Sequence, residues 1–324
     1  MAKYKVVVTD LGYKTYDYEK NVLAAVDAEV VLASCRTEED VKKACRDADG
    51  VLLRSAPMPA AVVASLEKCK VIARYGVGVD NVDVESAPAK GIVVANVPGY
   101  CDDEVSTQAV ALICALMRKT VSHDKAVRAG KWDIGSADPI YRTKGKTLGL
   151  LGIGRIARTV AKKMAGFEMK MIAYDPYVTE EQVKGLGVTM VDLGTLLTTS
   201  DFLSIHAPLG PSTRHIIDAK ALAKMKPTVY IVNTSRGGLI DQKALTQALA
   251  DGKIAGAGLD VYEVEPLEAE SPLRRLDNCI LTDHAGWYSE ESIVELQTRA
   301  AQAVAAVLAG RRPESPVNPQ VYTK

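Results

Sequence analysis

Side chains able to anchor an anion and move a proton occur in three segments, each of which follows an apolar stretch typical of a β-strand. Segment 233–238 places Arg236 among small residues, where its guanidinium could hold a carboxylate through two hydrogen bonds. Segment 260–266 is acidic, and segment 283–288 contains His284, one of four histidines in the chain. Each group alone has an ordinary explanation: a surface arginine, solvated loop carboxylates or a structural histidine.

Taken together, the three groups have a more specific meaning. An arginine, an acid and a histidine supply what hydride transfer from a 2-hydroxy acid requires: a carboxylate anchor, a proton acceptor and a partner that tunes the acceptor. Ligands of open parallel sheets bind at the carboxyl ends of the strands. We therefore expect this chemistry at the carboxyl ends of the strands that precede the three segments.

A glycine-rich turn near the middle of the chain is typical of dinucleotide binding. Residues 147–151 predict a buried strand, and Gly152 allows a sharp turn after it. Gly154 lets a pyrophosphate approach the amides that open the following helix, where Ala157 provides the small residue that close packing requires. By itself the glycine pattern fits an ordinary turn equally well, but here it stands between a strand and a helix.

The acid that follows the next strand indicates which dinucleotide is bound. Residues 170–174 predict a second strand, which ends at Asp175. A carboxylate there accepts hydrogen bonds from the ribose hydroxyls of adenosine, whereas a 2′-phosphate would be repelled. The sequence therefore predicts NAD rather than NADP as the cofactor.

Strand and helix signals alternate along the whole chain, which favours two α/β units. The first unit has strands expected near 4–9, 29–33, 50–54, 70–74 and 92–96, and helices over 38–46 and 59–68. The second unit continues with strands expected near 201–206, 228–233, 256–261 and 279–283. A long helical stretch from about 103 to 129 joins the two. Because the opening strand of the first unit lacks a glycine-rich loop, we expect this unit to contact the substrate.

Composition narrows the functional class. The 324 residues carry a formal net charge of zero, which gives no electrostatic reason to bind nucleic acid or an anionic membrane. The six cysteines are scattered without metal-ligand spacing, so we expect no metal site and a reduced, cytoplasmic protein. A strand is predicted almost at the first residue, and no apolar run approaches membrane-spanning length. We therefore expect a soluble chain without a signal peptide.

These motifs, in this order, resemble the D-isomer-specific 2-hydroxyacid dehydrogenases over essentially the full length of the chain. The similarity also covers segments 74–81 and 96–99. Within the family, segment 284–290 is most similar to the branch that contains the C-terminal-binding proteins, and the phosphoglycerate dehydrogenases are a close second. The resemblance implies a catalytic trio of Arg236, Glu265 and His284. His284 would exchange a proton with the C2 hydroxyl, Glu265 would stabilise the imidazolium, and Arg236 would hold the carboxylate.

The resemblance also implies the remaining contacts. Arg155 and Ile156 would bind the pyrophosphate, and Asp260 would meet the nicotinamide carboxamide. The full set of implied cofactor contacts is Gly152, Gly154, Arg155, Ile156, Asp175, His206, Pro208, Thr213, Thr234, Ser235, Arg236, Asp260, His284 and Gly286. The implied substrate contacts are Arg74, Tyr75, Gly76, Val77, Gly78, Arg236, His284 and Trp287.

The architecture implied by the resemblance is discontinuous. Two Rossmann-like α/β domains with doubly wound parallel sheets would enclose a cleft that closes. Residues 1–101 and 295–324 would form the substrate domain, and residues 102–294 the NAD-binding domain. The family usually forms homodimers through the cofactor domain, beginning at the helical stretch 103–129. One departure is Thr107, which stands where relatives often carry an acid.

The substrate is the least determined feature. Trp287, with Tyr75 and Tyr100 nearby, favours a 2-oxo acid with an uncharged side chain. Arg54 instead favours a second anionic group such as a phosphate, as in the phosphoglycerate alternative. A third alternative is an NAD-responsive scaffold like the C-terminal-binding proteins, which would bind NADH with negligible turnover.

Overall fold

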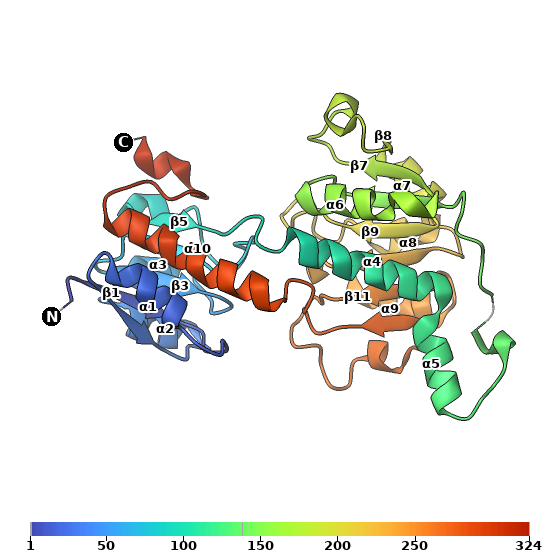
Figure 1. Cartoon of the computed structure of the whole chain (residues 1–324), viewed down its shortest axis with the longest axis horizontal. Helices are drawn as coiled ribbons and strands as arrows, with labels where there is room; N and C mark the ends of the chain where they lie inside the picture. The colour runs from blue at the N-terminus through green and yellow to red at the C-terminus, as the bar shows by residue number, and fades with distance from the viewer. Residues whose placement is uncertain (1, 138, 324) are drawn as a thin grey trace. The chain divides into compact units, whose positions relative to one another are not determined.

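The alternating strand and helix segments form two α/β units in the computed structural model, which describes residues 2–137 and 139–323 (Figure 1). Unit 1 combines the chain up to Cys101 with the chain from Ser289 onward, and unit 2 comprises Asp102–Tyr288. The α/β class with two parallel sheets is confirmed. The second boundary differs from the predicted 294–295, because Ser289 caps one unbroken helix, α10 (Glu290–Leu308), and the division falls before that helix.

Unit 1 is built on five parallel strands in the order β2-β1-β3-β4-β5. Their bounds are Ala28–Leu32, Tyr4–Val8, Gly50–Leu53, Val71–Arg74 and Val93–Ala95. The helices are α1 (Asp17–Ala24), α2 (Glu38–Cys45), α3 (Ala60–Ser65) and α10, with 3₁₀ helices η1 (Ala87–Lys90) and η7 (Pro319–Tyr322). Val41 of α2 and Val62 of α3 pack on one face of the sheet, while Val304 of α10 lies against Gly50 on β3. Helices α1 and α10 lie side by side (Figure 1).

Unit 2 is built on seven parallel strands in the order β12-β11-β10-β9-β6-β7-β8. Their bounds are Cys279–Leu281, Gly256–Leu259, Tyr230–Asn233, Phe202–Ile205, Thr147–Leu151, Lys170–Tyr174 and Val188–Met190. The helices are α4 (Asp102–Arg118), α5 (Thr120–Arg128), α6 (Arg155–Met164), α7 (Leu193–Thr199), α8 (Ala219–Lys224) and α9 (Gln242–Ala250). Short 3₁₀ helices are η2 (Ile134–Ala137), η3 (Ala165–Phe167), η4 (Glu180–Val183), η5 (Gly237–Leu239) and η6 (Pro272–Arg275). The strand order reverses between β6 and β9, which is where open sheets of this kind bind ligands.

Both faces of the unit 2 sheet are covered. Leu197 of α7 and Leu222 of α8 belong to one apolar cluster, and Leu112 of α4 and Val160 of α6 belong to another. A strand buried on two faces is mostly apolar, as Phe202–Ile205 is apart from Ser204, whose hydroxyl lies 2.8 Å from Nε2 of His206. No helix among the described residues is long and apolar enough to cross a membrane.

Some sequence expectations need correction. The helical stretch 103–129 is two helices, because Lys119 adopts a left-handed backbone with φ 49° and ends α4. Helix α5 has no buried residue, so nothing in this chain's own core holds it in line with α4. Helix α1 and strand β8 were missed, since the first is short and the second has three residues only.

Candidate active site

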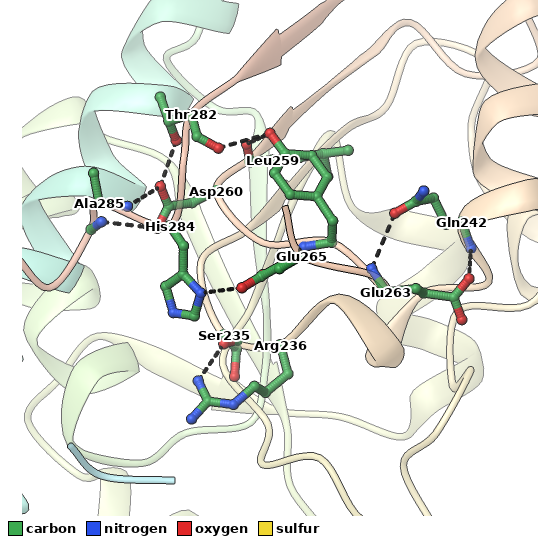
Figure 2. A network of polar contacts seen from close by, with 12 residues as sticks. Ser235, Arg236, Gln242, Leu259, Asp260, Glu263, Glu265, Thr282, His284 and Ala285 are labelled. Atoms are coloured by element: carbon green, nitrogen blue, oxygen red, sulfur yellow. Dashed lines mark hydrogen bonds and ion pairs between the residues drawn. The ribbon is translucent and has the colours of Figure 1, made fainter. Parts of the chain in front are cut away.

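The three predicted catalytic groups follow three adjacent strands of unit 2. Arg236 follows β10, Glu265 follows β11 and His284 follows β12, and these strands are neighbours in the sheet. The structure brings the side chains together (Figure 2). The Nδ1 atom of His284 lies 2.7 Å from Oε2 of Glu265. The backbone amide of Tyr262 donates to the other carboxylate oxygen, Oε1, at 3.0 Å. Glu265 is therefore fixed at both oxygens.

The loop that carries His284 is anchored to Asp260, the first residue after β11. His284 has a left-handed backbone with φ 57°, and its amide donates to the Asp260 carbonyl at 2.8 Å. The buried Asp260 carboxylate accepts hydrogen bonds from the amides of Ala285 at 3.0 Å and Gly286 at 2.9 Å. It also accepts from the Thr282 hydroxyl at 2.6 Å. The predicted contact of Asp260 with a carboxamide stays a prediction, because what the structure shows is this anchoring of the histidine loop.

The charge state of Glu265 follows from competing effects. Its partial burial raises the pKa of the carboxyl group, but the hydrogen bond and charge of His284 lower it, as do the Tyr262 amide and the charge of Arg236. The net effect is a pKa below the ordinary value. Glu265 is thus an anion at neutral pH, and it can stabilise a positive charge on the imidazole.

The loop that carries Arg236 packs closely against the loop that carries Glu265. The buried Asn233 accepts from the Ser235 amide at 3.0 Å and donates to the Arg236 carbonyl at 2.9 Å. The next residue, Gly237, packs so closely on the backbone of Tyr262 that a side chain would collide with the Tyr262 carbonyl. Because Tyr262 holds Glu265, the positions of arginine and glutamate are set by the same backbone contact.

The glycine-rich turn has the geometry that a dinucleotide requires. Gly152 has φ 88°, and a Cβ atom there would come within 2.8 Å of the Ala207 amide nitrogen. Gly154 faces open space within 4 Å, directly before α6 begins. Asp175 accepts hydrogen bonds from the amides of Ile153 at 3.1 Å and Tyr177 at 2.9 Å. The turn and the acid are therefore coupled, and they fit NAD: an open approach to helix amides, next to a carboxylate.

Other predicted cofactor residues surround the same strand ends. Nε2 of His206, which follows β9, lies 2.8 Å from the Ser204 hydroxyl, and burial lowers the pKa of His206 to about 4. The Thr213 hydroxyl donates to the Pro208 carbonyl at 2.7 Å, which closes the loop after β9. The buried Thr234 hydroxyl has no hydrogen-bond partner among the described residues, as expected for a group that a ligand completes.

Thr107 has a structural role at the start of α4. Lys163 on α6 donates to the Thr107 hydroxyl at 2.6 Å and pairs with the Asp103 carboxylate at 2.7 Å. Thr107 and Asp103 therefore hold the Lys163 side chain together at the start of α4. Arg155 pairs with Asp102 at 2.7 Å through its Nε atom.

The predicted substrate residues of unit 1 lie at the end of β4, which includes Arg74, and on the loop after it. Val77 is 40% exposed, whereas the Tyr75 and Tyr100 rings are buried. These two rings therefore pack within unit 1, and the expectation that they favour a substrate with an uncharged side chain stays a prediction. In unit 2, Trp287 is half-buried and packs edge-on against Tyr288, with 6.0 Å between ring centroids.

Several supporting residues were not predicted. Gln108 of α4 donates to Thr282 at 3.1 Å, and Tyr262 donates from its hydroxyl to the Thr282 carbonyl at 2.8 Å. His215 pairs with Glu263, two residues before Glu265, and Glu263 also bonds Gln242 (Figure 2 shows the latter). Side chains that support others across a sheet edge leave no local pattern. The acidic character of 260–266 indicated Glu263 alone among them.

Comparison with known proteins agrees with this geometry. Residues 110–286 match the family model of the D-isomer specific 2-hydroxyacid dehydrogenase, NAD binding domain. The chain belongs to the D-isomer-specific 2-hydroxyacid dehydrogenase family. Unit 2 of this family member therefore contains its NAD-binding domain, and the enzyme class expected from the motifs is confirmed.

Relatives within the family have different substrates in their names. A glyoxylate reductase from Korarchaeum cryptofilum is 41% identical over 280 residues, covering 85% of this chain and 84% of that protein. A D-3-phosphoglycerate dehydrogenase from Methanocaldococcus jannaschii is 40% identical over 316 residues, covering 97% of this chain but 59% of that protein. The structure of a glyoxylate reductase from Paecilomyes thermophila superimposes with a TM-score of 0.88 at 30% identity, covering 99% of this chain and all of that one. The narrower placement beside the C-terminal-binding proteins stays a prediction.

Proposed function

We propose that this protein interconverts a D-2-hydroxy acid and its 2-oxo acid with NAD as the hydride carrier. The observation that carries the proposal is the 2.7 Å pair between His284 and Glu265, which stands beside Arg236 at adjacent strand ends. When bound, NAD accepts or supplies the hydride at C2 of the substrate. The protein has to bind the substrate, orient it and move one proton.

His284 moves that proton. Its Nδ1 atom is engaged by Glu265, so Nε2 is the ring nitrogen that meets the substrate oxygen. In oxidation, neutral His284 takes the proton of the C2 hydroxyl. In reduction, the imidazolium returns that proton to the carbonyl oxygen. The Glu265 anion stabilises the imidazolium in both directions, and it keeps the ring in one orientation.

Arg236 and the loop after β4 bind the substrate carboxylate. A guanidinium holds a carboxylate with two parallel hydrogen bonds and draws charge toward the neighbouring carbonyl. The amides of Gly76, Val77 and Gly78 serve the same carboxylate. On the cofactor side, Asp175 accepts from the ribose hydroxyls, and Arg155 at the start of α6 faces the pyrophosphate.

The test is NADH oxidation with a panel of 2-oxo acids, beginning with glyoxylate and continuing through apolar, aromatic, dicarboxylic and phosphorylated members. Turnover with at least one member supports the proposal. Tight NADH binding without any turnover refutes it and favours a scaffold. The matched variant His284→Gln keeps a polar side chain but cannot transfer the proton, so it should abolish turnover while NADH binding persists.

A second candidate substrate class is the phosphorylated acids. The M. jannaschii relative supports it, and Arg54 follows β3 with its guanidinium 5.7 Å from the centre of the Tyr13 ring. Faster turnover with 3-phosphohydroxypyruvate than with glyoxylate would select this candidate. Loss of that preference in Arg54→Gln would assign it to Arg54.

We further propose that the chain forms a homodimer through α5 and the segment that follows it. Helix α5 buries none of its residues, and three large apolar side chains nearby are unusually open: Val127 is 53% exposed, Trp132 is 92% exposed and Ile134 is 90% exposed. Large apolar side chains that are exposed close together in the sequence are typical of protein interfaces. A second copy of the chain is the partner that the family resemblance implies.

A further inference from the structure

A buried polar cluster in unit 1 lies directly behind the loop that we propose binds the substrate carboxylate. Glu19 on α1 is fully buried. The Tyr75 hydroxyl donates to its Oε1 atom at 2.7 Å. The side-chain amide of Gln297, on α10, donates to both carboxyl oxygens at 2.9 and 3.1 Å. Three elements far apart in the sequence therefore meet at one carboxyl group.

This cluster is an unusual way to fill a core. A buried carboxyl group costs free energy unless it is fully hydrogen-bonded, and apolar residues of similar volume stabilise such positions equally well or better. The cluster even leaves the Gln297 carbonyl oxygen buried without a hydrogen-bond partner among the described residues. Hydrogen bonds fix the orientation of a side chain, because a donor and an acceptor must meet at a defined distance and angle. Apolar packing imposes no such requirement.

The residue whose direction is fixed is Tyr75. Its ring is 2% exposed, and its amide donates to the Leu53 carbonyl at 2.7 Å. The next residue, Gly76, accepts from the Val97 amide at 2.9 Å, and the Arg74 guanidinium packs against it. The chain is thus held at the Tyr75 backbone, at its hydroxyl and at the Gly76 carbonyl. Immediately afterwards Val77 emerges to solvent.

We propose that Glu19, Tyr75 and Gln297 are positioning residues that fix the backbone of Gly76, Val77 and Gly78 for binding the substrate carboxylate. The role in substrate binding rests on the proposed function. The fixing of the loop does not, and it can be measured without substrate. Tyr75 acts through its hydroxyl and its backbone, while its ring faces the core of unit 1.

The test compares Tyr75→Phe, which removes a single oxygen atom, with wild type. The first readout is amide hydrogen exchange of the peptide 75–80 in the free protein. We expect exchange to be about tenfold faster, the equivalent of one lost hydrogen bond to a carboxyl group. Peptides covering 147–160 in unit 2 should be unchanged. The matched control is Tyr16→Phe, which removes a hydroxyl that donates to the Asp10 carbonyl at 3.0 Å in the same unit.

The second readout is kinetic, with glyoxylate as the probe. Tyr75→Phe should raise KM for glyoxylate about tenfold and leave KM for NADH unchanged, because the loop meets the acid and not the dinucleotide. Glu19→Gln keeps an oxygen that accepts from Tyr75 and should stay near wild type in both readouts. Glu19→Leu should behave like Tyr75→Phe. If Glu19→Leu does not fold, Tyr75→Phe and Glu19→Gln carry the comparison.

The outcomes separate the two proposals. Unchanged exchange of 75–80 in Tyr75→Phe overturns the positioning role, as does an equal rise of both KM values. Faster exchange with no turnover of any 2-oxo acid by wild type supports the positioning role and refutes the proposed function.

Discussion

His206 should contribute a separable part of the acid sensitivity of unit 2. His206 has its pKa lowered by burial to about 4, from an ordinary value of 6.5. Below pH 6.5 the unfolded chain takes up a proton at this position, while the folded chain does not until about pH 4. Protonation therefore favours the unfolded state, and stability present above pH 6.5 is lost as the pH falls toward 4. The loss attributable to His206 is about 2 kcal/mol at pH 5 and about 3 kcal/mol at pH 4.

The perturbation is His206→Gln, which cannot take up this proton. Urea unfolding at pH 7 and pH 5 can be followed by the fluorescence of Trp287, which is half-buried in unit 2 and becomes exposed on unfolding. Wild type should lose about 2 kcal/mol more between the two pH values than the variant does. A matched control is His123→Gln on α5, which should follow wild type. Equal losses in wild type and His206→Gln would refute the reasoning.

Three further predictions concern the proposed chemistry and assembly. Glu265→Gln removes the anion that stabilises the imidazolium, so kcat should fall about 100-fold or more while KM for NADH stays unchanged. Stopped-flow and steady-state assays can check both values, and an unaltered kcat would show that the pair of His284 and Glu265 does not transfer the proton. Asp175→Ala should weaken NADH about tenfold in fluorescence titrations while NADPH binding improves, and an equal loss for both would show that Asp175 only supports the turn. Trp132→Asp should convert a dimer to a monomer in sedimentation velocity without changing far-ultraviolet circular dichroism, and an unchanged sedimentation coefficient would place the interface elsewhere.

Local patterns in the sequence predicted the parts of the fold that depend on local physics. The turn at Gly152 and the acid at Asp175 could be predicted because a strand, a tight turn and a helix must follow one another in the chain. The end of α4 at Lys119 could not, since a left-handed lysine has no composition signal and the apolar residues continue beyond it. The boundary between the two units at Ser289 could not be predicted either, because it depends on α10 being one unbroken helix that Ser289 caps.

The candidate site shows the same distinction. Arg236, Glu265 and His284 each looked ordinary in isolation, and the resemblance to a family was needed to join them. The orientation of Tyr75 was beyond the sequence, because its hydroxyl meets Glu19 and Gln297, which come from opposite ends of the chain. Asp260 was expected at the cofactor, and its hydrogen bonds to the histidine loop depend on a register between β11 and β12 that no pattern encodes.

The anchoring by Asp260 joins the two segments that carry Glu265 and His284 within unit 2. Asp260 precedes the segment that carries Glu265, and its carboxylate holds the segment that carries His284. The distance between Glu265 and His284 is therefore set by contacts within unit 2, and these contacts are present without substrate. In the proposed function unit 1 helps to bind the substrate, so substitutions there would exchange one 2-oxo acid for another without moving the pair of His284 and Glu265.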